Sequence, residues 1–477
     1  MKKTLFFSFG LCFLCANHSF NLLAQEYKSF DLNKYYTPDI VRNGLSLSGS
    51  SNGKLDNQTD ESQQGEFNAN LNVQLYSYLS TRKLVRSIST TMNLSGITDS
   101  EKTLSTGLNS KSSNFNSRFG FNTNYKLYNP QNKFISLGGA LSSWYDSGSS
   151  NRTDTLEHSD TGNRKYIGAN ADLYVGAGIG RIENVTEARQ ALFLIDVFSK
   201  NNILSRDLTY NEIWNLAQEM SRIKNKRFLD SRLHLMSEIS HVDSFLTANN
   251  LITKPDALYF TNLYDIWLYG DAFQRLSGQS IELRLNPDFD VRSFNSKYDN
   301  TIDGVYNYSS ENNNFRANYS FSLLYQYEKV INQEWQKSAN ASININLINL
   351  NNEQTYSNNN INKMSTKEDI ASLSGAYGIG YYPNTRTNIY ANINQVLSSS
   401  FYNTRTLNGV IETNDQRSLI SDTYLEVGTY YYFSPQLRLS ASANISNHYF
   451  TNDITNSTLQ QNRLIGNYSI GLSYSFF

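Results

Sequence analysis

The sequence predicts an all-β transmembrane antiparallel barrel of about 14 strands that carries an inserted α-helical module. Three observations predict it. The closing residues, Asn467 to Phe477, alternate in side-chain character with a period of two. The same alternation returns along most of the 477-residue chain. Between Arg181 and Gly278 the apolar period changes to 3.6, which indicates helices.

The amino terminus has the features of a secretory signal. Lys2 and Lys3 precede an apolar run from Leu5 to Ala16, and Ala24 is a small residue suited to cleavage. The run is shorter than the ~20 residues that a membrane-spanning helix needs, so any membrane insertion must use strands. Cys12 and Cys15 both lie inside this signal. The mature chain is therefore expected to have no thiol, which suits a protein that crosses an oxidising compartment.

Composition favours a barrel over a soluble domain. Mean hydropathy is -0.50, yet aromatic residues make up 13% of the chain and charged residues only 17%. A barrel needs only every second residue to be apolar, and its Tyr and Phe gather at the membrane interfaces. The net charge of -1 argues against a nucleic-acid partner.

The clearest strands have one apolar face and one face of Asn, Ser, Thr and Gly. The pattern is strict from Phe67 to Leu75 and returns at 115–126, 315–326 and 437–445. The last strand alone would also fit a buried strand of a soluble sandwich. As a barrel end, its expected assembly signal comprises Tyr468, Ile470, Leu472, Tyr474, Phe476 and Phe477.

Connections alternate between short turns and long polar loops. Short turns are expected at 81–83, 129–132, 332–334, 383–385 and 434–436. Long loops are expected at 54–64, 99–111, 148–163, 296–313, 351–368, 403–417 and 451–462. This asymmetry predicts about 14 strands with both termini on the periplasmic side. Two aromatic girdles are expected to face lipid, from Tyr76, Tyr78, Tyr128, Tyr325, Tyr327, Trp335, Tyr381, Tyr431, Phe433 and Phe476 near the turns and from Trp144, Tyr145, Tyr402, Tyr449 and Phe450 near the loops.

The inserted module is expected to hold four helices. Thr209 to Glu212 forms a capping box that opens an apolar stripe. The other helices are expected at 185–199, at 228–248 and from Pro255 onward. Strand parity places the module in the periplasm. The chain returns from the module on a strand expected at 281–292, and Pro287 within this strand removes a ladder hydrogen bond.

The predicted organisation divides the chain into five parts. These are a signal peptide at 1–24, a periplasmic or plug segment at 25–43, a first barrel part at 44–180, the helical insert at 181–278 and a second barrel part at 279–477.

The signal, the alternating strands, the turn and loop asymmetry and the terminal Phe together resemble the Gram-negative outer-membrane β-barrel proteins. The resemblance covers most of the mature chain outside the insert, and no motif narrows it to one family. It implies residence in the outer membrane. It also implies contact with outer-membrane lipid and lipopolysaccharide, insertion by the barrel assembly machinery, and an unidentified periplasmic or envelope partner for the insert.

Twelve polar residues are expected to line the lumen. They are Glu66, Arg118, Lys126, Asp172, Glu282, Arg284, Arg316, Glu328, Asp422, Glu426, Arg438 and His448. A barrel wider than ~8 strands cannot fill itself with wall side chains, so these charges border water or a plug. The alternative is that they only cross-link the wall.

Two chemical motifs have ordinary explanations. His448 is expected to face Ser421 or Asp422, which would suit either a catalytic pair or a lumen ion pair. The glycines at 176, 178 and 180 do not match a phosphate-binding fingerprint, and a close-packed strand exit explains them. Without a positioned nucleophile or a set of metal ligands, no enzymatic activity, cofactor or metal is expected.

A basic cluster lies in the insert, formed by Arg222, Lys224, Lys226, Arg227 and Arg232. Such clusters are usually solvated, and some contact anionic lipid or a partner. Two function classes remain open at this stage. One is a polar pore that the insert gates or connects to a periplasmic partner. The other is a non-conducting anchor or adhesin that presents the insert and the loops.

Overall fold

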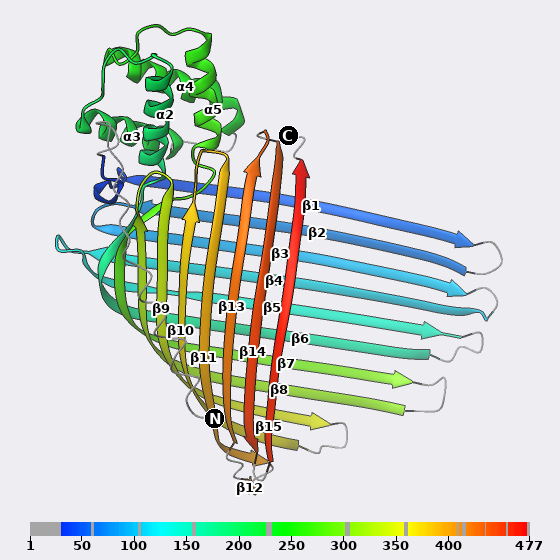
Figure 1. Cartoon of the computed structure of the whole chain (residues 1–477). Coiled ribbons are helices and arrows are strands. Elements are labelled where there is room, and N and C mark those ends of the chain that lie inside the picture. Colours follow the sequence, from blue (N-terminus) through cyan, green and yellow to red (C-terminus); the bar gives the residue numbers. More distant parts are fainter. Residues whose placement is uncertain are drawn as a thin grey trace.

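The computed structural model describes residues 30–474 except 59–61, 104–105, 155–158, 226–230, 301–305, 357–360, 408–409, 413–415, 435 and 455–456. Within these residues, fourteen long strands form one antiparallel sheet in chain order, which confirms the predicted strand number (Figure 1). The long strands are β1 (Ile40–Gln58), β2 (Ser62–Ser80), β3 (Leu84–Thr103), β4 (Leu108–Tyr128), β5 (Lys133–Thr153), β6 (Ser159–Asn184), β7 (Leu276–Asn300), β8 (Tyr306–Val330), β9 (Trp335–Tyr356), β10 (Ile361–Tyr381), β11 (Thr387–Leu407), β13 (Gln416–Tyr432), β14 (Leu437–Ile454) and β15 (Ser457–Tyr474). The three-residue strand β12 (Val410–Glu412) pairs only with β11.

The sheet has an apolar face, called here the outer face, and a polar face, called the inner face. Leu71, Leu137 and Leu283 lie on the outer face and are 39–62% exposed. The inner face is the concave one, because side chains from distant strands meet there. Lys126 of β4 bonds to Glu282 of β7 at 3.0 Å, although two strands lie between them.

Among the described residues, no protein covers the apolar face of the sheet. The buried hydrophobic core is formed by the helical module, residues 30–35 and Val330, whereas large apolar side chains on the strands remain exposed. A contiguous exposed apolar surface of this extent indicates that the outer face needs an apolar environment outside the protein.

The apolar band is shorter than the strands. On β7 it runs from Ile281 to Val291 and then gives way to Ser293, Asn295 and Lys297. Eleven tilted residues span roughly 25 Å, the usual height of the lipid-facing band of a barrel. The segments beyond the band were expected to be long loops, and that expectation was wrong in extent: most of 99–111, 148–163 and 351–368 is paired strand. These extensions carry polar residues on both faces, which gives them the composition of loops.

The sheet is open in this structure. Among the described residues no pairing joins β1 to β15, so the expected closed barrel is not observed. Tyr468, Ile470 and Leu472 on β15 are 67–82% exposed, more than outer-face residues of inner strands. Both edges thus present unpaired backbone groups.

The helical module lies at the short-turn ends of the strands (Figure 1). It consists of α2 (Thr186–Lys200), α3 (Tyr210–Asn225), α4 (Ser231–Ala248) and α5 (Ala257–Tyr269), which confirms the four expected helices. The capping box is also confirmed: the Thr209 amide donates to the Glu212 carboxylate at 2.9 Å, and the Glu212 amide donates to Thr209 Oγ1 at 3.4 Å. None of the described helices is both long and apolar enough to span a bilayer.

Two glycines shape the path into and out of the module. Gly180 and Gly278 have φ values of +99° and +125°, and a Cβ atom at either position would lie about 2 Å from a carbonyl oxygen of the neighbouring strand. The strands continue past them to Asn184 and resume at Leu276, so the helices occupy less than the expected 181–278. Pro287 does interrupt the β6–β7 pairing, which lacks partners between Asp288 and Leu285, while β7 itself continues.

We expect Glu212→Gln to destabilise the module by about 1 kcal/mol, because it removes the negative charge that Arg206 and the helix N-terminus stabilise, although the amide oxygen can still accept from Thr209. Hydrogen bonds from Arg206 and Thr209 lower the pKa of Glu212 from 4.5 to about 2. The carboxylate therefore stabilises the folded module fully above about pH 4.5, and this contribution disappears as the pH falls toward 2. Thermal unfolding of the helical circular-dichroism signal should show this pH dependence in the native chain and less of it in the variant. Equal pH dependence in both would contradict the assignment.

Candidate functional site

All twelve residues expected to line the lumen lie on the inner face, as the strand registers place them. They do not form one cluster. The densest group surrounds Glu282, which is only 4% exposed. Its carboxylate accepts from Ser136 Oγ at 2.7 Å, from Lys126 Nζ at 3.0 Å and from Arg284 at 2.8 Å. Burial of this carboxylate is tolerated because two cations and a hydroxyl compensate it.

Most other inner-face charges are also paired. Asp290 forms two bonds with Arg292, of 2.5 and 3.0 Å. Asp172 accepts from Asn286 at 2.8 Å, and Asp288 accepts from Asn170 at 2.6 Å. The two Asn–Asp pairs join β6 to β7, whereas the Asp290–Arg292 pair lies within β7.

His448 lies opposite Asp422 in the β13–β14 register and its Nδ1 contacts the carboxylate, so the expected juxtaposition is confirmed. Both side chains are almost half exposed. The described residues contain no group of three or more His, Cys, Asp and Glu side chains placed to bind a metal ion. An inner-face ion pair accounts for this geometry.

The short-turn end of the sheet is attached to the module by two arginines that are 0% exposed, Arg189 of α2 and Arg275 just before β7. Arg275 donates to the carbonyls of Asn332, Gln333 and Trp335 at 2.9–3.1 Å, all in the β8–β9 turn. Arg189 donates to the same Gln333 carbonyl at 2.9 Å and to carbonyls of the β10–β11 turn. Burial lowers the pKa of Arg275 to about 10, and burial with the nearby Arg275 lowers the pKa of Arg189 to about 9, so both remain charged at neutral pH.

Aromatic rings close the space around these arginines. The Arg275 guanidinium lies 4.5 Å from the centre of the Tyr382 ring. Phe273 packs 5.9 Å from both Tyr382 and Tyr432, and Tyr269 packs 6.0 Å from Tyr432. Because Tyr382 and Tyr432 extend the inner-face rows of β10 and β13, these contacts lie at the mouth of the concave surface.

The N-terminal segment also lies at this mouth. Asn33, in the short helix η2 (Leu32–Lys34), donates to the Val330 carbonyl at 2.9 Å and accepts from Ser277 Oγ at 2.8 Å. Phe30 stacks on Tyr210 of α3 at 4.6 Å. The expected plug segment 25–43 thus has its described part at the mouth, and its last four residues already belong to β1.

The basic cluster of the module is not one surface. Arg222 is exposed and pairs with Glu219 at 3.2 Å. Lys224 is buried, with its ammonium 2.8 Å from Asp271 and 5.1 Å from the centre of the Trp267 ring, so its expected contact with lipid or a partner is wrong. Lys226 and Arg227 lie outside the described residues, and of Arg232 only its place in α4 is described.

The strand registers place only part of the expected aromatic girdles on the outer face. Outer-face positions are held by Tyr145, Tyr325, Tyr327, Trp335, Tyr381, Tyr431, Phe433 and Tyr449. The expectation was wrong for Tyr76, Tyr78, Tyr128, Trp144, Tyr402 and Phe450, which lie on the inner face. Nearness to a turn sets the height of a residue on the wall, whereas its face depends on register. Phe476 and Phe477 lie outside the described residues.

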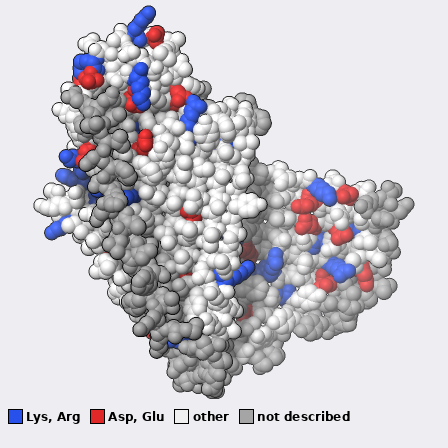
Figure 2. Space-filling view, in the orientation of Figure 1, with Lys and Arg blue, Asp and Glu red and all other residues white. Residues whose placement is uncertain are grey.

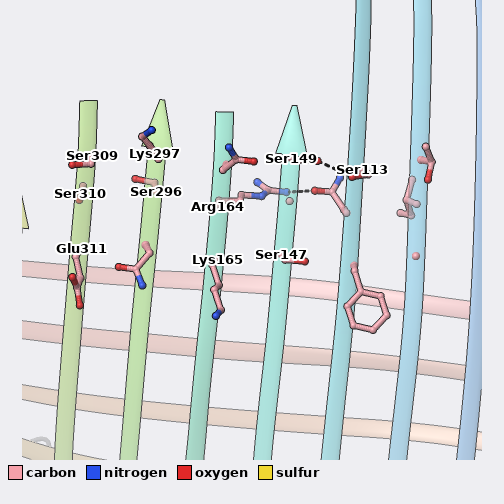
Figure 3. A pocket seen from close by; sticks show the side chains of 18 of the residues that line it. Ser113, Ser147, Ser149, Arg164, Lys165, Ser296, Lys297, Ser309, Ser310 and Glu311 are labelled. Carbon is pink, nitrogen blue, oxygen red and sulfur yellow. Dashed lines mark hydrogen bonds between the residues drawn. The ribbon is translucent and has the colours of Figure 1, made fainter. Parts of the chain in front are cut away.

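A groove that the sequence did not predict lies at the far ends of β3 to β9, and residues of both faces line it (Figure 3). It has a volume of about 760 Å³ and is bordered by hydroxyl and amide side chains together with Arg164, Lys165, Lys297 and Glu311. Arg164 crosses over Gly148 to donate to Asn114 at 3.0 Å, and a Cβ at Gly148 would lie 2.7 Å from the guanidinium. Gly148 and Asn163 belong to an expected loop, which is why the groove was missed. Figure 2 shows charged side chains gathered at these far strand ends and on the module.

Comparison with known proteins gives the following. No protein-family model matches the chain, and no curated protein matches it. Among solved structures, a TodX monoaromatic hydrocarbon channel mutant matches at 9% identity and a TM-score of 0.29, with 94% of this chain and 92% of that chain covered. The autotransporter NalP translocator domain of Neisseria meningitidis matches at 9% and 0.23, covering 93% and 91%. OmpT of Vibrio cholerae, an outer membrane protein, matches at 11% and 0.22, covering 91% and 97%. Scores this low assign the chain to none of these families.

We expect Arg275→Ala to loosen the module from the sheet by about 3 kcal/mol, because it removes a buried guanidinium that bonds three turn carbonyls. The thermal midpoint of the helical signal should fall by more than about 10 °C, while the strand signal is retained. The matched control is Arg222→Ala, which removes an exposed arginine and should shift the midpoint little. Equal midpoints for the two variants would show that Arg275 does not hold the module.

Proposed function

We propose that this chain is an outer-membrane β-barrel with a polar lumen, and that the helical module gates its periplasmic mouth. The observation that supports it most directly is the docking of the module on the mouth of the polar face through Arg189 and Arg275. A covering held by buried charged groups is specific in geometry, and it releases when those bonds break.

Membrane residence is supported by the uncovered outer face. Its apolar band has the height of a bilayer core and ends in outer-face aromatics such as Tyr145 and Trp335. With the short turns and the module on the periplasmic side, the polar strand extensions reach the cell exterior.

Closure of the sheet is supported by the module, which touches both halves of the open sheet. Arg42 of β1 contacts Asn225 of α3, and Arg386, just before β11, contacts Asp265 of α5. In lipid, the unpaired edges of β1 and β15 would cost several kcal/mol for each exposed backbone group, so pairing them is strongly favoured.

The registers restrict how the two edges can meet. Following the pairing from Ile40 on β1 from strand to strand leads to Gln461 on β15. A barrel of fourteen strands tilted by about 36–45° has a shear of about 14 to 18. Ser46 then lies opposite Ser469, Gly471 or Ser473, all on the inner face.

We expect Ser46→Cys to form a disulfide with one of Ser469→Cys, Gly471→Cys and Ser473→Cys in outer membranes, because paired residues lie within the reach of a disulfide. Both native cysteines are in the expected signal peptide, so the mature background should be free of thiols. Mobility on a non-reducing gel reports the bond. The matched control places the second cysteine at outer-face Ile470. If none of the three pairs bonds, the seam does not close in this way.

The gated-channel proposal rests on the inner face. A fourteen-stranded barrel is too wide for wall side chains to fill, so its interior holds water unless a segment occupies it. The described segments at the mouth are residues 30–36 and the module, and both lie at the short-turn end. A gated channel requires a covered mouth at one end and a hydrated wall beyond that mouth.

The second candidate is a non-conducting anchor. It is favoured by the same occlusion, if the module never leaves, and by the strand extensions that protrude beyond the apolar band. In that case the barrel would serve to present the extensions or the module to partners.

Planar-bilayer recordings separate the two. We expect full-length protein to be mostly closed, and both Arg189→Ala/Arg275→Ala and a variant with 186–274 replaced by a Gly-Ser linker to conduct, because each uncovers the mouth. Arg222→Ala should behave as the native chain. Absence of current in every variant leaves the anchor, and a steadily open native protein removes the gate.

A further inference from the structure

Three aromatic side chains form a continuous platform on the inner face of β5, β6 and β7. Trp144 and Tyr166 have ring centroids 6.2 Å apart, and Tyr166 and Phe294 are 6.4 Å apart. Tyr166 and Phe294 are register partners, and Trp144 is paired with Gly168. Because they face away from lipid, a place in the membrane girdles does not account for them.

The Trp144 ring can lie against the wall because Gly168 beneath it has no side chain. A Cβ at Gly168 would lie 2.2 Å from two ring carbons, so the indole covers this glycine. Arg292 lies 5.6 Å from the ring centre. The ring is thus fixed at the wall by the glycine that it covers and by the guanidinium that lies over it. An aromatic surface fixed in this way costs little entropy when a ligand stacks on it.

Hydrogen-bonding groups surround the platform, and their charges are matched. Asn116 contacts Asp146, whose register partner is Tyr166. Arg292, whose guanidinium lies over the Trp144 ring, is bonded to Asp290. Asp146 and Asp290 balance Arg164 and Arg292 in charge. The site therefore offers donors and acceptors without an excess of either sign, which favours a neutral, polar ligand over an anion or a cation.

A pocket lies against two of the three rings, and Trp144 adjoins it through its contact with Tyr166. The pocket has a volume of about 480 Å³ and is lined by Tyr166, Phe294, Asp146 and Asn116. It shares Arg164 and Asn114 with the 760 Å³ groove at the strand ends, so the two form one path. Volumes of this size are typical of ligand sites.

We propose that this path binds a neutral oligosaccharide. A pyranose ring has an apolar face of C–H groups, which lies favourably on the electron-rich face of an aromatic ring, and a rim of hydroxyls that can bond carboxylates, amides and guanidinium groups. Alternating aromatic and paired polar groups match both features. The inference rests on the proposed function in one respect: it places the site in the outer vestibule of the channel.

The test is calorimetric titration of full-length, folded protein in lauryldimethylamine oxide, a detergent without sugar, with maltohexaose and with cellohexaose. We expect binding of at least one of them. Trp144→Ala should weaken it at least about tenfold, the equivalent of about 1.4 kcal/mol for a lost aromatic platform. Gly168→Ala should weaken it similarly, because the new methyl group displaces the indole while every aromatic residue remains.

The matched control is Tyr145→Ala, the adjacent residue on the outer face, which should leave binding unchanged. The heat-dependent gel shift verifies folding, and Trp144→Leu serves if Trp144→Ala does not fold. No binding of either sugar, or binding that is indifferent both to the loss of the Trp144 ring and to Gly168→Ala, overturns the proposal. Tighter binding of an oligogalacturonate of equal length overturns its neutral class.

Failure of this inference and failure of the channel are distinguishable. Binding is measured without a membrane potential or current. Protein that binds sugar and never conducts contradicts only the channel, whereas protein that conducts and binds no sugar contradicts only the saccharide site.

Discussion

The constraint on which the structure depends is that the outer face of the sheet carries an apolar band that no described residue covers. Leu71, Leu137 and Leu283 stay exposed although similar side chains in the module are almost fully buried. The sheet thus obtains its stability from its backbone pairing and from an apolar solvent, while the module obtains its own from a conventional core. The polar inner face follows from this, since the alternate residues are freed from packing.

Two such different bodies need a junction that does not rely on apolar burial. Arg189 and Arg275 provide it by bonding turn carbonyls that would otherwise lack donors. Each strand turn exposes carbonyls at the rim, and a guanidinium offers several donors in fixed directions. The bonds of this junction are directional, so they fix how the module sits on the rim.

Glycine and aromatic residues cooperate along the inner face. Tyr174 covers Gly138, Trp144 covers Gly168 and Tyr390 covers Gly428, each ring lying where a Cβ would clash. Such pairs shield a glycine backbone and keep large rings flat on the wall, so the interior remains open. The same device that preserves the lumen creates the stacking surface at Trp144.

The sequence by itself determined the strand number, the two faces, the change of period at the module and the capping box at Thr209 and Glu212, because these depend on residues within a few positions of one another. Only the tertiary structure decided that Trp144 lies on Gly168, that Lys224 is buried and that Arg275 reaches the β8–β9 turn. These contacts join residues about 20 to 60 positions apart through strand register and helix packing, which no local period encodes. Polar strand extensions were mistaken for loops for the same reason, since pairing with a neighbour, rather than composition, makes them strands.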